Sequence, residues 1–128
     1  MEIYNTKDAV ITYHTENNVL VQTINDYLNS NALREFYTEF VKICKTLKVS
    51  KIISDTKQQK IIQLEDLEWM KYFIIPETIS SGVEYFAIVM PENTFGKLAM
   101  KSIAEAANEI TVNLFEDLLS AKEWISEC

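Results

Sequence analysis

The segment Tyr85–Met90, YFAIVM, restricts the fold of this chain more than any other stretch. Its residues are apolar at both odd and even positions, whereas a strand with one wet face alternates apolar and polar side chains. A strand buried on both faces is therefore predicted. Pro91 ends it, because proline cannot donate to a central ladder, and Glu92-Asn93-Thr94 supplies capping residues for a helix from Phe95. The segment predicts a strand–turn–helix unit in the middle of an α/β domain.

Length and composition indicate a single domain over residues 1–128. A chain of this length buries roughly two thirds of the surface that its unfolded form exposes. Hydrophobic residues make up 48% of the sequence, and two glycines and two prolines leave few positions for flexible linkers. The formal net charge of −7 argues against a nucleic-acid partner, because contacts with phosphates need a cationic face.

Basic residues are concentrated in one segment of this acidic chain. The segment from Lys42 to Lys60 contains six lysines and a single acid, Asp55. These lysines either form a local basic patch or complement the C-terminus of a helix and cover exposed loops, which is the more usual role.

The two cysteines and the first residues favour a reducing compartment. Cys44 falls on the apolar face of a predicted helix and Cys128 is the last residue, so we expect two free thiols. No basic region followed by an apolar run opens the sequence, and no stretch approaches the ~18 consecutive apolar residues of a membrane span. We expect a cytoplasmic protein without integral membrane association.

Motifs for catalysis, cofactors and metals are missing from the sequence. Two glycines leave no Gly-rich phosphate loop, and there is no CxxC, HExxH or nucleophile elbow. His14, the only histidine, lies at the tip of a predicted hairpin, where a solvated turn residue is expected rather than a ligand or a triad member. We expect no enzymatic activity, no cofactor and no metal.

The N-terminal part is predicted to form a hairpin and a long helix. The hairpin pairs Ala9–His14 with Val19–Ile24 across an asparagine-containing turn, and Glu2–Tyr4 adds a short piece of edge strand. Apolar residues then recur at three- and four-residue steps over 33–47, which predicts a helix of about four turns that packs on the sheet. Ser30 or Asn31 is expected to cap it.

A short strand, Lys51–Ser54, ends in Asp55 and Thr56. Ligands of open α/β sheets bind at the carboxyl ends of parallel strands, which makes both residues candidate contacts by position. The alternative is that Asp55 bonds backbone amides within the turn.

The segment Leu64–Ile75 is predicted to be a helix that ends before Pro76, with acids in its first turn. Trp69, Tyr72 and Phe73 widen its apolar face beyond a single stripe. This aromatic group is either buried in the core or forms a binding patch for a ligand or partner.

The C-terminal part is predicted to contain a helix, an edge strand and a closing helix. The apolar face of the first helix runs from Phe95 to Ile110, and Phe95 is a further candidate contact. Thr111–Phe115 alternates and is typical of an edge strand. Asp117 is expected to cap the closing helix, which Trp124 helps to dock.

The order of these elements and certain residues resemble the SpoIIAA-like family of the STAS fold group. The residues that carry the resemblance are Asp55, Trp69, Pro76, Gly82, Ala87, Pro91, Phe115, Asp117, Ala121, Trp124 and Ile125. The resemblance covers nearly the whole chain and rests on structural motifs. It implies an N-terminal hairpin leading into a superhelix of β–α units, with a mixed, mostly parallel sheet of about five strands and four helices.

The resemblance also implies relatives with known roles, namely bacterial anti-sigma-factor antagonists and, more distantly, lipid-carrying CRAL-TRIO domains. The antagonists carry a D-S-[ST]-G segment with a phosphorylated serine at the start of the second helix. The corresponding region here, Ile62–Leu67, has no hydroxyl side chain, so this switch is not expected. CRAL-TRIO domains use a longer chain to enclose their cavity.

Three functions are consistent with the sequence. The first is a non-enzymatic regulatory module that binds an unknown protein partner through its sheet-end loops or its aromatic helix surface. The second is a small-molecule or acyl-chain binding protein, which requires a sizeable apolar pocket. The third is an enzyme of unrecognised type, which requires titratable groups that converge in a cleft.

The handedness of the fold raises the question of how the central strand is covered. Right-handed crossovers between successive parallel strands place the connecting helices on one face of the sheet. Tyr85–Met90 is nevertheless apolar on both faces. The second face is expected to be covered by the C-terminal helix with Trp124, by the N-terminal segment, or by a second copy of the chain in a homodimer.

Overall fold

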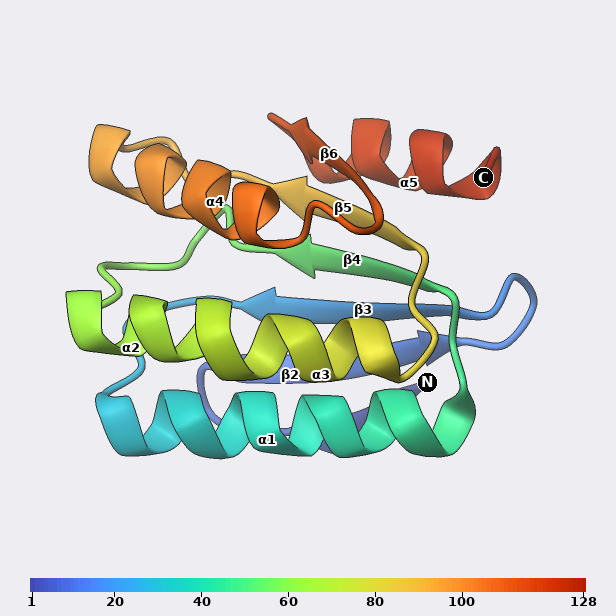
Figure 1. Ribbon diagram of the computed structural model, residues 1–128, viewed down its shortest axis with the longest axis horizontal. Helices are drawn as coiled ribbons and strands as arrows, with labels where there is room; N and C mark the ends of the chain where they lie inside the picture. The colour runs from blue at the N-terminus through green and yellow to red at the C-terminus, as the bar shows by residue number, and fades with distance from the viewer.

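The computed structural model describes residues 1–128 as a six-stranded sheet packed between helices, in which the strands lie side by side in sequence order (Figure 1). β3 to β6 run parallel to one another. β2 pairs with β3 in the antiparallel direction, and β1 pairs with β2 in the antiparallel direction. The strands are β1 (Glu2–Asn5), β2 (Ala9–His14), β3 (Val19–Ile24), β4 (Lys51–Asp55), β5 (Tyr85–Val89) and β6 (Thr111–Phe115). The predicted fold class is confirmed. The sheet has six strands rather than about five, because the first residues pair along β2.

The helices divide unequally between the two faces of the sheet. The large core cluster joins one face to α1, to the helix that runs from α2 to α3, and to α4, as right-handed crossovers require. α5 packs alone against the other face, over β4, β5 and β6. The helical elements are α1 (Ser30–Leu47), α2 (Leu64–Trp69), η1 (Met70–Ile74), α3 (Ile75–Ser80), α4 (Thr94–Ala106) and α5 (Leu118–Ser126).

β5 is buried on both faces, as its sequence predicts. Phe86 and Ile88 belong to the large cluster under α1 to α4. Ala87 and Val89 point the other way, into a smaller cluster that α5 completes with Ile125. The C-terminal helix thus provides the cover that the sequence required, and the homodimer remains an untested prediction.

Pro76 does not end the second helix, which corrects the boundary predicted from sequence. The chain forms a π-helical segment, η1, immediately before the proline, and the N–H of Ile75 donates to the carbonyl of Met70, five residues back. Proline lacks an N–H and its ring clashes with the carbonyl four residues earlier, but the wider π turn moves that carbonyl aside. The helix therefore continues to Ser80, and Gly82, which has a positive φ of 109°, follows the capping residue Ser81.

The helix caps agree with the sequence at two of three ends. Asn93 and Asp117 cap α4 and α5 by accepting backbone N–H groups, as predicted. The cap of α1 is Asn29, one residue earlier than expected, and its side chain accepts from the N–H of Ala32 at 2.9 Å. Asn29 has the extended backbone that an N-cap requires, whereas Ser30 is already helical.

We predict that the two faces of α5 contribute very differently to stability. Ile125 is fully buried against the sheet, so Ile125→Ala should lower the free energy of unfolding by about 2 to 5 kcal/mol in urea titrations. Leu119 lies on the same helix and is 68% exposed, so Leu119→Ala is the matched control and should change stability by less than about 0.5 kcal/mol. Equal effects of the two substitutions would contradict the packing of α5 on β5.

Candidate functional site

The carboxyl ends of the four parallel strands lie at one end of the molecule, where α1, α2 and α4 begin (left in Figure 1). Four loops meet there: 25–29 after β3, 56–63 after β4, 90–93 after β5 and 116–117 after β6. No regular element covers this end, so its surface is formed by loop side chains and by the first turns of the helices.

The turn after β4 is held from inside the protein. Thr56 is 1% exposed, and both its N–H and its hydroxyl donate to the carbonyl of Val89, at 3.0 and 2.6 Å. The carboxylate of Asp55 accepts the N–H of Lys57 at 3.1 Å, which is the turn role given above as the alternative. Thr56 is thus unavailable as a surface contact, and Asp55 serves the turn from a half-buried position.

The loops are also tied to one another. The N–H of Lys60 donates to the carbonyl of Asp26 at 3.4 Å, which joins the loops after β4 and β3. The ammonium of Lys57 donates to the carbonyl of Glu116 at 2.8 Å and lies 3.4 Å from the carboxylate of Glu92. These contacts fix three loops relative to the loop after β4.

The lysines of residues 42–60 do not form one continuous patch. Lys57 holds the loops, while Lys45 lies 2.6 Å from Glu77 and Lys42 lies 3.4 Å from Glu39. Three of the six lysines are thus paired with acids, and Lys45 also lies in the last turn of α1, where a base complements the helix C-terminus.

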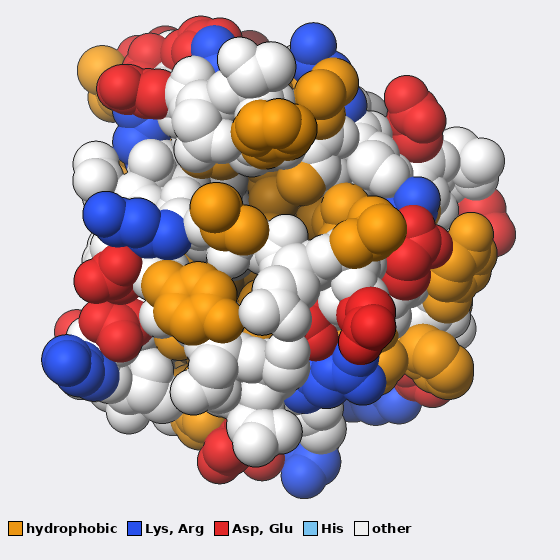
Figure 2. Space-filling model, turned by 90° about the vertical axis from the view of Figure 1, so that its left-hand side faces the viewer, with side chains coloured by type: hydrophobic (Ala, Val, Ile, Leu, Met, Phe, Trp, Pro, Cys, Tyr) orange, Lys and Arg blue, Asp and Glu red, His pale blue; other side chains and the backbone are white.

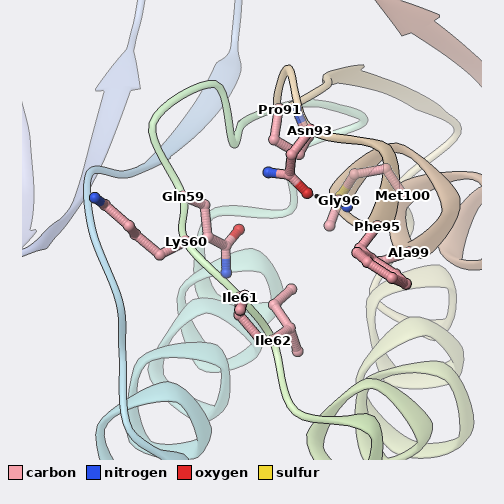
Figure 3. Close-up of a pocket in the computed structure, with 10 residues that line it drawn as sticks. All are labelled: Gln59, Lys60, Ile61, Ile62, Pro91, Asn93, Phe95, Gly96, Ala99 and Met100. Carbon is pink, nitrogen blue, oxygen red and sulfur yellow. Dashed lines mark hydrogen bonds between the residues drawn. The ribbon is translucent and has the colours of Figure 1, made fainter.

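A pocket of about 50 Å³ opens between the loop after β4 and the first turns of α4 (Figure 3). It borders a wider, open depression of about 590 Å³. Apolar groups of Ile61, Ile62, Pro91, Phe95, Ala99 and Met100 form most of the pocket wall. Its polar lining includes the side chain of Gln59.

Gln59 is buried at the back of this pocket although it belongs to a loop. Its N–H donates to the carbonyl of Thr56 at 3.0 Å, and its side chain is 5% exposed. The amide oxygen Oε1 is buried and accepts no hydrogen bond. Such unpaired buried acceptors are few in native proteins, and Oε1 of Gln22 is a second one in this protein.

The start of α4 approaches the loop after β5 closely. A Cβ atom on Gly96 would lie 2.3 Å from Cγ of Pro91, so no other residue fits this position without a shift. The N–H of Gly96 donates to the capping oxygen of Asn93 at 2.6 Å. Glycine is therefore required here by close packing.

Exposed apolar side chains surround the pocket and define what we call the carboxyl-end surface: Tyr27, Ile61, Leu64 and Phe95. Phe95 is 82% exposed, although the periodicity of α4 placed it on the buried face. Its turn of α4 extends beyond the end of β5, where there is no sheet to pack on (Figure 1). Figure 2 views the molecule from this end and shows apolar side chains gathered in its middle, with acidic and basic side chains around them.

The aromatic candidates of the second helix do not line the pocket. Trp69 is half-buried and packs partly on the core, and the guanidinium carbon of Arg34 lies 5.0 Å from the centre of its ring. Tyr72 and Phe73 are exposed on the π-helical segment. The structure thus divides the aromatic group between the two interpretations left open by the sequence.

A buried carboxylate fixes the start of α2 to α1. Asp66 is 2% exposed and accepts two hydrogen bonds, from the Ser30 hydroxyl at 2.7 Å and from Nε of Arg34 at 3.0 Å. Its spacing marked it only as an acid of a first helical turn. The partners lie more than thirty residues away in the sequence, so no local pattern identifies them.

Few titratable groups have shifted pKa values, and they do not converge. Burial raises the pKa of the Cys44 thiol to about 12 and also raises that of Tyr37. A backbone hydrogen bond from Ser120 lowers the pKa of Asp117. No group of three or more His, Cys, Asp or Glu side chains is arranged to hold a metal ion.

The interior holds a cavity of about 20 Å³, lined by Gln22, Tyr37 and Ser54 among apolar side chains. This volume suits a single water molecule and is far below the several hundred Å³ of ordinary ligand pockets. The oxygen Oε1 of Gln22 is buried and unpaired there, which a water molecule would satisfy. No helix has both the length and the apolar character needed to cross a membrane.

Two solved structures share this architecture. A candidate anti-sigma factor antagonist from Thermotoga maritima superposes with a TM-score of 0.64 at 18% identity, over 90% of this chain and 92% of that one. An uncharacterised Shewanella loihica protein described as having a SpoIIAA-like fold gives 0.66 at 13% identity, over 96% and 98%. The chain has the SpoIIAA-like fold.

The match to the SpoIIAA-like, or STAS-like, fold confirms the resemblance at the level of architecture. No family model matches the chain, and no curated protein matches its sequence. Within the SpoIIAA-like fold, the pocket and the carboxyl-end surface are formed by the loops after β3, β4 and β5 and by the start of α4.

We predict that removal of the Asp66 carboxylate destabilises the protein. Asp66→Ala loses two charge-assisted hydrogen bonds, but Arg34 is partly exposed and regains water, so the free energy of unfolding should fall by about 2 to 3 kcal/mol. Glu65→Ala removes an exposed acid from the same first turn and should cost no more than about 0.5 kcal/mol. Urea denaturation checks both, and similar losses would contradict the role of Asp66.

Proposed function

We propose that this protein is a non-enzymatic regulatory module that binds another protein through its carboxyl-end surface. The observation that carries the proposal is the cluster of exposed apolar side chains on loops that are fixed to the sheet and on the first turns of α2 and α4. Exposed apolar side chains that gather on one surface mark interaction sites more often than scattered ones do. Loops that are already ordered lose little conformational freedom on binding, which favours affinity.

The alternatives have less support. An acyl-chain carrier needs an apolar cavity of several hundred Å³, whereas the interior cavity measures about 20 Å³. The depression of about 590 Å³ is open to solvent, so it does not enclose an acyl chain. An enzyme needs titratable groups that converge with perturbed pKa values. The shifted groups here are Tyr4 on β1, Tyr37 and Cys44 within α1, and Asp117 at the start of α5.

We predict that the module binds its partner without control by phosphorylation at the start of the second helix. No Ser or Thr occurs between Lys57 and Tyr72, and the hydroxyls of Thr56 and Ser30 are engaged with Val89 and Asp66. Mass spectrometry of the protein isolated from its own cells should find no phosphate on Thr56 or Ser30. A phosphate on either residue would contradict this prediction and would indicate a phosphorylation switch at a position other than the start of the second helix.

We predict that single polar substitutions on the carboxyl-end surface weaken partner binding without unfolding the protein. Phe95→Ser and Ile61→Ser each remove an exposed apolar contact, and each should lower the retention of a partner by about tenfold or more. The measurement is affinity capture from the source cells with the wild type and the variants, followed by titration of the captured protein. Circular dichroism should remain unchanged.

Leu119→Ser is the matched control, because Leu119 is equally exposed but lies on α5, against the opposite face of the sheet. A captured protein that this variant also loses would contradict binding at the carboxyl-end surface. Light scattering tests a second copy as the partner: a mass near 14.8 kDa excludes the homodimer, and twice that mass, lost in Phe95→Ser, establishes it.

A further inference from the structure

β6 (Thr111–Phe115) is an open edge of the sheet. It lies outermost, and only β5 pairs with it (Figure 1). Edge strands usually avoid further pairing through charged residues, proline or a bulge, and β6 has none of these over its five positions. The opposite edge, β1, begins with a charged residue and has a shift of register between Glu2 and Tyr4. β6 is therefore the edge at which this sheet can accept another strand.

The free backbone groups of this edge belong to Val112 and Leu114. The N–H of Thr111 and the carbonyl of Phe115 bond to the residues that flank β5, at 3.0 and 2.9 Å. Alternate residues of a strand direct their backbone groups to opposite sides, so those of Val112 and Leu114 point away from β5. Only the N–H of Leu114 has a partner, the side-chain oxygen of Asn113 at 3.2 Å. The other three groups form no hydrogen bond within the protein.

A second copy of the chain offers matching groups in the antiparallel direction. With a two-fold axis beside Asn113, Val112 lies opposite Leu114 of the second copy, and these two residues exchange both of their backbone hydrogen bonds. The axis repeats the exchange, so every free group of the edge is paired. The N–H of Leu114 then donates to a carbonyl of the second copy in place of the Asn113 oxygen. The two Asn113 side chains face each other across the axis.

An open groove of about 380 Å³ runs between β6 and α4. Val112 and Leu114 line it and pack against the large core cluster, yet both remain half-buried. A second copy would complete their burial, which is favourable for apolar side chains. The apolar lining is completed by Ala104, Ala107 and Ile110.

The charges of the groove are complementary to themselves. Lys101 and Glu105 lie about one turn apart on α4, and both line the groove and are exposed. Neither forms a salt bridge within the chain. The axis beside Asn113 places α4 of the second copy antiparallel to the first, so Lys101 of each copy faces Glu105 of the other. Complementary charges of this kind fix the register of an interface.

We propose that β6 pairs with β6 of a second copy, antiparallel and centred on Asn113, which joins two six-stranded sheets across a two-fold axis. An extended peptide of another protein would use the same backbone groups but would lack the reciprocal partners for Lys101 and Glu105. The interface lies along the edge of the sheet, and the carboxyl-end surface lies at the strand ends. This inference is therefore independent of the proposed function.

Opposite charges at position 113 test the pairing. Asn113 is exposed, so Asn113→Lys and Asn113→Asp should leave the circular dichroism unchanged. Each variant places like charges opposite each other across the axis and should raise the dissociation constant, measured by sedimentation equilibrium, by about fivefold. An equimolar mixture of the two forms a mixed dimer with opposite charges and should associate more tightly than either variant alone. A wild type that stays near 14.8 kDa throughout the concentration series, or a mixture no tighter than the variants, would overturn the proposal.

Exchange of the groove charges gives a second test of the register. Lys101→Glu and Glu105→Lys should each weaken the dimer, and the double variant should restore it, because the reciprocal pairs are rebuilt with opposite sign. A double variant as weak as the single ones would contradict the antiparallel arrangement. Asn5→Lys is the matched control, since Asn5 is exposed on the opposite edge of the sheet, and its dissociation constant should equal that of the wild type. A change as large as that of Asn113→Lys would reject β6 as the interface.

The result is separable from that of the proposed function. Phe95→Ser and Ile61→Ser should keep the dimer, and a dimer that either one dissociates would overturn the edge pairing. If the chain stays monomeric and loses a captured partner in Asn113→Lys, the edge binds an extended peptide and the second copy is rejected. A dimer that persists while no partner depends on Phe95 or Ile61 supports the edge pairing and contradicts the proposed function.

Discussion

The burial of β5 on both faces is the constraint on which the rest of the structure depends. Right-handed crossovers place three helical segments on one face of the sheet, and the apolar pattern of β5 then leaves Ala87 and Val89 without cover on the other. α5 supplies this cover through Ala121 and Ile125. The C-terminal helix is therefore part of the core of the domain, and without it one face of the central strand would be exposed to solvent.

The same strand positions the candidate site. The carbonyl of Val89, at the end of β5, accepts both hydrogen bonds of Thr56 and thereby fixes the turn after β4. Gln59 follows in that turn, and Pro91 and Asn93 follow β5 directly. The pocket thus lies between two segments that are anchored at the ends of adjacent strands, which explains why a loop site here is rigid.

Features that depend on neighbouring residues were predicted from the sequence, and features that depend on distant contacts were not. β5, the cap Asp117 and the capping segment Glu92-Asn93-Thr94, in which Asn93 is the cap, were predicted correctly, because a strand pattern and a cap depend on neighbouring residues. The helix through Pro76 was missed, because the π turn that accommodates the proline depends on packing of the whole helix. Periodicity placed Phe95 in the core, because it carries no information on where the sheet beneath a helix ends.

The candidate site left a weaker trace in the sequence. Ile61 and Ile62 form an apolar pair in an otherwise polar loop, and this pattern could have indicated an apolar binding surface from the sequence. Gln59 left none, because a single buried amide in a loop has no period, and its unpaired oxygen is a property of the folded chain. Asp55 and Thr56 were correctly located at a strand end, but the structure uses them to hold the turn.

Gly96 gives the pocket a property that depends on a missing atom. Because the first turn of α4 touches Pro91 where a side chain would begin, the packing of this wall of the pocket depends on the absence of a Cβ. An added methyl group would force Pro91 or the first turn of α4 to shift. Alanine scanning identifies residues by removing side-chain atoms, so it does not detect a position whose role depends on having no side chain. The close contact between α4 and Pro91 therefore depends on an atom that glycine lacks.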